Sequence, residues 1–148
     1  MKIARYYLLF CLSFIPAAHA ESLTLKIGGR TVTAEIADTP ESREHGLMQR
    51  NRLCADCGML FVFPVAKAYG FWMKNTPLPL SIAFIAQNGR IINMAEMQPY
   101  TLDIHYAEGN ALYALEMSRG WFAAHGVKPG DEVKGIHKGV SLAGANAN

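Results

Sequence analysis

Beyond its first twenty residues, the sequence has little cysteine, no excess of either charge and no long apolar run. The 14 Lys and Arg residues include Lys2 and Arg5, so the rest of the chain carries 12 basic residues against 12 acidic ones. A balanced charge leaves no electrostatic footprint for nucleic acid, and we expect no nucleic-acid partner. No later apolar stretch approaches the roughly 20 residues of a membrane-spanning helix, so we expect no span there.

The sequence also lacks the short motifs of common catalytic sites. It contains no serine-centred nucleophile elbow, no phosphate-binding loop and no histidine pair at metal-binding spacing. Its histidines are scattered, and each one alone is typical of a surface or capping residue. We therefore expect no metal and no cofactor, and we favour a binding module over an enzyme.

Residues 1–20 have the pattern of a cleaved signal peptide. Lys2 and Arg5 give a positive start, the apolar stretch Tyr6–Ile15 follows, and Ala18-His19-Ala20 is a small-x-small cleavage site. The apolar stretch is too short to cross a bilayer as a helix. The sequence thus predicts a periplasmic or secreted protein.

The rest of the chain has the length of one domain, which we place at residues 21–138, followed by a flexible tail of small and polar residues over 139–148. Several short stretches are either continuously apolar or alternate apolar with polar residues, and Gly and Pro turns separate them. This pattern predicts β-strands. We expect loops over Pro64–Gly70 and Gln98–Asn110. The predicted strands are Leu23–Ile27, Thr31–Ile36, Met59–Phe63, Phe71–Lys74, Leu80–Ala86, Arg90–Met97, Ala111–Ser118 and Glu132–His137.

Two short helices are predicted, at about 40–50 and about 120–125. Thr39 can cap the first helix and Pro40 suits its first position. Gly46 within it costs about 1 kcal/mol relative to Ala. A close approach to another element would explain why a glycine stands there.

Short strands without strand–helix alternation favour a mainly-β fold, an antiparallel sandwich or a partly closed barrel.

Cys54 and Cys57 are the two cysteines outside the leader. An exported protein meets an oxidising compartment, so the pair predicts a disulfide. Its loop is small and its stabilisation should be on the order of 2 kcal/mol. The pair follows a predicted helix instead of preceding one, and so lacks the usual setting of a reactive thiolate. Thiol redox chemistry, or copper handling together with methionines, is the alternative.

The segment Trp72–Thr76 is the sharpest polar feature of the sequence. Strand alternation would place Trp72 and Lys74 on one face and Asn75 on the other. An aromatic wall beside an ammonium and an amide is typical of a ligand pocket. The alternative is a Lys that extends into solvent and an Asn that ends the strand.

Glu116 stands between Leu115 and Met117 inside an apolar predicted strand. An acidic residue is rarely fully buried unless it is paired. Its partner would be Lys74, Arg43 or Arg119. A general acid or base is the other interpretation of such a carboxyl.

Five stretches, taken in order, form a recognisable pattern: Arg43-x-x-Gly46-Leu47-Met48-x-Arg50, Gly58–Phe63, Phe71–Thr76 with Pro79-Leu80, Leu115-Glu116 with Gly120, and Gly130-Asp131-x-Val133. In that order they resemble the domain-of-unknown-function 192 family. The resemblance covers roughly Leu23–Ile136 and implies a mainly-β sandwich or barrel with a short helix near its start. It implies no activity. The family usually has an Asp after the Pro-Leu pair where this chain has Ser81, which weakens any role that needs a carboxylate there.

From these observations we expect a module that binds a small ligand or a component of the cell envelope. One alternative is a hydrolase or lyase that uses Glu116 and Lys74, and another is the redox or copper protein built on Cys54 and Cys57. The expected pocket residues are Trp72, Lys74, Asn75, Glu116, Arg43 and Met59.

Overall fold

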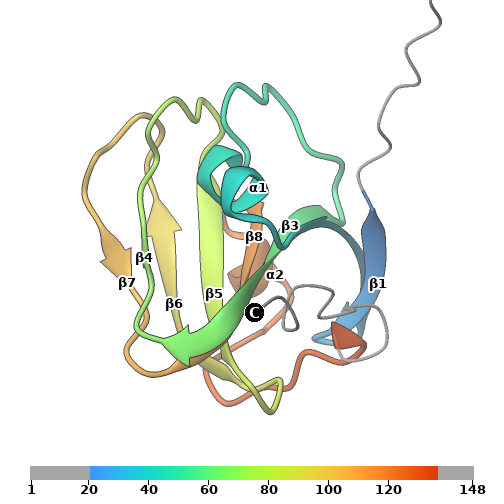
Figure 1. Cartoon of the computed structure of the whole chain (residues 1–148). Coiled ribbons are helices and arrows are strands. Elements are labelled where there is room, and N and C mark those ends of the chain that lie inside the picture. The colour runs from blue at the N-terminus through green and yellow to red at the C-terminus, as the bar shows by residue number, and fades with distance from the viewer. Residues whose placement is uncertain (1–20, 137–148) are drawn as a thin grey trace, which may run out of the picture.

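The computed structural model describes residues 21–136, so the predicted signal peptide and the predicted tail over 139–148 lie outside the described residues (Figure 1). The chain is mainly β, as expected. None of the helices in 21–136 is long and apolar enough to cross a membrane. The elements are β1 (Ser22–Ile27), β2 (Arg30–Ala37), α1 (Pro40–His45), β3 (Cys57–Lys67), β4 (Gly70–Phe71), β5 (Leu80–Ala86), β6 (Ile91–Met97), β7 (His105–Tyr106), β8 (Ala111–Ser118) and α2 (Trp121–Ala124).

Six strands form one mixed sheet in the order β1-β2-β3-β8-β5-β6, and β4 pairs with β7 in a small second sheet. The predicted antiparallel arrangement is wrong at one place, because β2 and β3 run parallel. A parallel pair needs a crossover connection, and α1 lies in the connection between these two strands. The other pairs of the large sheet are antiparallel.

The two faces of the large sheet carry two separate cores. Along β8, Leu115 and Met117 join the first core, whereas Ala114 joins the second. Successive side chains of a strand point to opposite faces, so Glu116 lies on the face of Ala114. Trp121 and Phe122 of α2 cover the first face. The segment around α1 and Phe71 of β4 cover the second, and Figure 1 shows the two helices on opposite sides of the sheet.

The sheet is not closed into a barrel, because its edge strands β1 and β6 do not pair with each other. The predicted strand Glu132–His137 is also wrong within the described residues. Its place is taken by two isolated bridges, from Lys134 to Lys26 of β1 and from Glu132 to Arg90 just before β6. This segment thus binds both edges of the sheet at one end, while His137 lies outside the described residues.

Three other segments differ from the sequence-based expectation. The strand β3 continues through Pro64 to Lys67, where a loop was expected. The strand expected at Phe71–Lys74 ends at Phe71. The loop expected over Gln98–Asn110 contains the short strand β7. The extension of β3 depends on its pairing with β8, where Lys67 lies opposite Ala111. The other two differences depend on the pairing of β4 with β7. Both pairings join segments far apart in the sequence.

Helix α1 is shorter than the predicted range of about 40–50, although it begins as expected. Thr39 Oγ1 accepts a hydrogen bond from the Ser42 amide at 3.1 Å, and Pro40 is the first helical residue. The helix ends at His45 because Gly46 has a φ of 49°. A Cβ on Gly46 would lie 3.2 Å from the Phe61 ring, which is the close approach that the sequence suggested.

Candidate ligand-binding site

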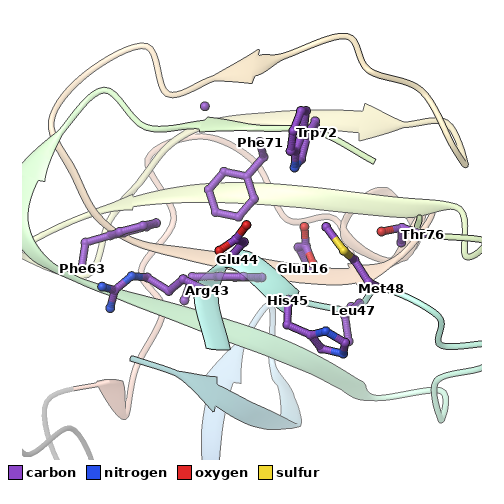
Figure 2. A pocket seen from close by; sticks show the side chains of 13 residues that line it. Arg43, Glu44, His45, Leu47, Met48, Phe63, Phe71, Trp72, Thr76 and Glu116 are labelled. Carbon is purple, nitrogen blue, oxygen red and sulfur yellow. The ribbon is translucent and has the colours of Figure 1, made fainter. Parts of the chain in front are cut away.

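A cavity of about 240 Å³ opens on the second face of the large sheet, beneath α1 and β4 (Figure 2). Figure 2 shows the rings of Phe71 and Trp72 on one side of it and the α1 segment on the other, with Glu116 between them. The lining residues are 43–48 from α1 and the turn after it, Phe61 and Phe63 from β3, Gly70–Trp72, Thr76 and Glu116.

Glu116 forms the polar floor of this cavity. It lies on β8, directly beside Met59 of β3 and Ile82 of β5. The residue is only 4% exposed. No hydrogen bond or ion pair from any residue in 21–136 reaches its carboxyl group. Burial without a compensating partner raises the pKa of Glu116 to about 8, so most of this carboxyl is protonated at neutral pH.

The structure does not pair Glu116 with any of the three basic residues suggested by the sequence. Lys74 places its ammonium 5.1 Å from the centre of the Trp72 ring. Arg119 lies on the surface, with its Nε 3.6 Å from a carboxylate oxygen of Glu96. Arg43 uses its Nη1 to donate to backbone carbonyl groups. The structural ion pair expected for Glu116 is therefore wrong, because all three cations have other partners.

Aromatic rings form much of the cavity wall. Phe71 makes edge-to-face contacts with Phe61 and Phe84, at centroid distances of 4.9 Å and 5.7 Å. Phe63 stacks on Tyr69 at 3.6 Å. Such interlocking rings hold one another in place, so we expect the wall to be preformed in the free protein.

Three of the six pocket residues expected from the sequence line the cavity, namely Arg43, Trp72 and Glu116. Lys74 and Asn75 are exposed and do not line it. Met59 is buried beside Glu116 but contributes no lining surface.

The expected convergence of Lys74 and Asn75 on Glu116 does not occur, because the chain turns after Met73. Asn75 has a φ of 54°, and the Thr76 amide donates to the Met73 carbonyl at 3.1 Å. Strand alternation therefore cannot decide which way Lys74 and Asn75 point. It is Thr76, the next residue, that turns back into the cavity and is buried.

Sequence reasoning missed Phe61, Phe63, Phe71 and Thr76 as lining residues, and most of the α1 segment. Phe61 and Phe63 share strand parity with Met59, so alternation along β3 could have placed all three on one face. Nothing in the sequence indicated that Phe71 would pack against this face, since that follows from the β4–β7 pairing.

The predicted disulfide between Cys54 and Cys57 is present and lies away from the cavity. Asp56, between the two cysteines, accepts a hydrogen bond from Trp121 Nε1 at 3.0 Å. Because Trp121 belongs to the first core, the disulfide loop is tied to the opposite face of the sheet. Within 21–136, no three His, Cys, Asp or Glu residues are grouped so that they could hold a metal ion.

Ser81 lies on the face opposite Glu116. Its hydroxyl donates to Glu96 at 2.7 Å and accepts from the Gly120 amide at 2.8 Å. On β5, the neighbouring Ile82 belongs to the second core, so alternation directs Ser81 to the other side. The position where an Asp was expected by resemblance is therefore a buried hydrogen-bonding node, separate from the cavity.

The fold and the site together define a small mixed-β domain with an aromatic cavity and, at its floor, a buried carboxyl that no residue in 21–136 pairs. The chain belongs to the DUF192 family, described as "Uncharacterized ACR", whose model matches residues 23–135. A comparison with the curated proteins finds no match.

Two solved structures are similar to this chain. One is a protein from Sinorhizobium meliloti 1021 whose name suggests a transcription regulator. Its sequence identity to this chain is 35% and its TM-score is 0.78, and the match covers 84% of this chain and 99% of that one. The other is a protein of unknown function from Novosphingobium aromaticivorans DSM 12444, with 31% identity and a TM-score of 0.74, covering 82% and 91%.

Proposed function

We propose that this protein is an exported module that binds a small organic ligand, or a small part of an envelope component, in the cavity above Glu116. Export is inferred from the signal-peptide pattern of residues 1–20. The observation that carries the binding proposal is the carboxyl group of Glu116, which is buried, lines the cavity and has no partner among the residues that the structure describes.

A carboxyl that is 4% exposed and has no partner within residues 21–136 is costly for a folded protein, even though its oxygens keep a small accessible surface in the cavity that it lines. Polar groups removed from water are nearly always hydrogen-bonded in native structures, and those that are not call for an explanation. Replacing Glu116 by an apolar residue of similar size would continue the second core. A ligand that supplies the missing hydrogen bonds would explain why a carboxyl stands there.

The rest of the cavity agrees with this role. Ligand sites are concave and mainly apolar, with a few convergent polar groups that orient the ligand. Phe61, Phe63, Phe71 and Trp72 provide the apolar wall, and Glu116 provides the polar group. A cavity of about 240 Å³ would hold a compact molecule below drug size.

The test is a screen of several hundred compact metabolites by thermal shift, since a ligand that binds only the folded state raises the melting temperature. We expect hits whose shift is reduced in Glu116→Gln and in Trp72→Ala, because both residues line the cavity. Glu108→Gln and Tyr100→Ala are matched controls, since both residues are exposed and lie outside the cavity. Hits that are equally strong in all four variants would place the ligand elsewhere and refute the proposal.

A second candidate function is catalysis in which Glu116 acts as a general acid. A carboxyl with a pKa of about 8 holds its proton at neutral pH, as a general acid must. Lys74, the partner proposed from the sequence, is not available because it lies outside the cavity. Mass spectrometry of each hit after incubation tests this role: a product that forms with wild type but not with Glu116→Gln would support it.

A further inference from the structure

The polar groups of the cavity that remain available are mostly hydrogen-bond acceptors. The Thr76 hydroxyl donates its proton to the Lys74 carbonyl at 3.1 Å, which leaves its oxygen free to accept. The carboxyl groups of Glu44 and Glu116 both line the cavity. The Glu116 carboxyl accepts through both oxygens when it is ionised and through its carbonyl oxygen when it is protonated. A ligand that satisfies these acceptors brings hydrogen-bond donors of its own.

The one guanidinium in the cavity wall is already engaged. Arg43 donates from Nη1 to the carbonyl of Val62 at 2.9 Å and to the carbonyl of Asp38. Its guanidinium carbon lies 5.7 Å from the centre of the Phe63 ring. Figure 2 shows this group extending toward Phe63 and away from Glu116. Arg43 therefore leaves the space directly above Glu116 without a cation from residues 21–136.

The walls around that space suit a positive charge. Phe61 and Phe71 line it, and the faces of aromatic rings attract cations, by about 0.5–2 kcal/mol for each well-placed ring. The Trp72 ring also lines it and already has the Lys74 ammonium 5.1 Å from its centre. A cation also regains at a buried carboxylate the charge-assisted hydrogen bonds that it loses on leaving water. Aromatic walls and an unpaired acid favour the same kind of ligand.

Resting on the ligand-binding function above, we propose that the ligand is an organic cation, a small apolar body that carries an ammonium or amidinium group. The cationic group lies against the Glu116 carboxyl with Thr76 as a second acceptor, and the apolar body packs against Phe71 and Trp72. Glu44, which lines the same cavity and is exposed, adds negative charge for the approaching cation.

This arrangement makes binding pH-dependent. The cation binds the ionised carboxylate, and a group with a pKa of about 8 is ionised to about 1% at pH 6 and to half at pH 8. The apparent affinity for an amine should therefore rise roughly 50-fold between these pH values. The other charged or titratable side chains of the cavity are Arg43, Glu44 and His45, all from the α1 segment. The residues beside Glu116 on β3 and β5, Met59 and Ile82, are uncharged.

The test compares two probes of nearly the same shape, phenethylamine and 2-phenylethanol, by NMR titration of the complete exported protein. An alkyl amine, with a pKa of about 10, stays protonated over the range used. We expect the amine to bind at least tenfold more tightly than the alcohol at pH 8, with the pH dependence given above. Glu116→Gln should remove both the preference and the pH dependence, whereas Glu108→Gln should keep both.

The possible failures can be told apart. Equal affinity for the two probes would overturn the cationic ligand but leave a ligand-binding cavity. A pH dependence that persists in Glu116→Gln would come from another group, such as His45, and would also overturn the inference. If neither probe binds while the metabolite screen yields an uncharged ligand at Glu116, the cation is wrong and the binding function holds. If the screen is empty as well, both proposals fail.

Discussion

Replacing Glu116 by Gln should abolish a dependence of protein stability on pH that the wild type carries. Gln has nearly the same shape as a protonated Glu and stays neutral at every pH. Burial raises the pKa of Glu116 from its ordinary value of 4.5 to about 8 in the folded protein. The folded state therefore holds this proton more tightly than the unfolded state. The stability contributed by protonation is complete below pH 4.5 and is lost as the pH rises through 8.

The magnitude follows from the difference of about 3.5 between the two pKa values. At 1.36 kcal/mol for each pKa unit, the free energy of unfolding should fall by about 5 kcal/mol in total. Between pH 5.5 and 7.5 the loss should be roughly 2–3 kcal/mol, since the slope there approaches 1.36 kcal/mol for each pH unit. This is a large part of the 5–15 kcal/mol by which ordinary domains are stable.

Urea unfolding of wild type and Glu116→Gln at half-unit steps from pH 5 to 9 measures this loss. The difference between the two proteins removes the contributions of all other titrating groups. It should be small near pH 5 and grow in favour of the Gln variant until it levels off above pH 8. Glu108→Gln, which changes an exposed carboxyl, should follow the wild type. Parallel curves for wild type and Glu116→Gln would show that the carboxyl is not desolvated, and would refute the reasoning.

Three further changes give distinct results in the same urea assay. Replacing both Cys54 and Cys57 by Ser should lower the free energy of unfolding by about 2 kcal/mol, because the disulfide closes a small loop. Ligand binding should be unchanged, because that loop lies away from the cavity. Loss of binding would contradict this prediction. Ser81→Ala should cost about 1–3 kcal/mol, since it removes a donor to Glu96 and leaves the partly buried Gly120 amide without its acceptor; a neutral effect would argue against that node. Gly58→Ala should cost at least about 3 kcal/mol, because its Cβ would lie 2.4 Å from the backbone oxygen of Glu116. Gly109→Ala, whose Cβ meets only ordinary contacts, is its control, and equal stability of the two variants would refute the predicted clash.

The strands that the sequence predicted most accurately lie at the centre of the sheet. Leu80–Ala86 and Ala111–Ser118 were expected with the bounds that β5 and β8 have. Both are short, apolar and bounded by turn residues, so local pattern was sufficient. Glu116 stood out for the same reason, because a charged residue interrupts an otherwise apolar run.

Local pattern failed where a residue's environment is set by a distant segment. The parallel pairing of β2 with β3, the extension of β3 to Lys67 and the pairing of β4 with β7 join parts of the chain that no short window contains. Lys74 and Asn75 were assigned to the pocket by strand alternation, and the turn at Asn75 removed them from it.

The sequence by itself determined the family, the mainly-β class and the single unusual carboxyl of Glu116, since each is written in short stretches of chain. Only the tertiary structure decided that this carboxyl has no partner in the described part of the chain. That outcome depends on where Lys74, Arg43 and Arg119 find their own contacts, and on the fold that places Phe61, Phe71 and Trp72 around Glu116. Burial and pairing arise from long-range packing, which is why the site could be suspected from the sequence but not assembled from it.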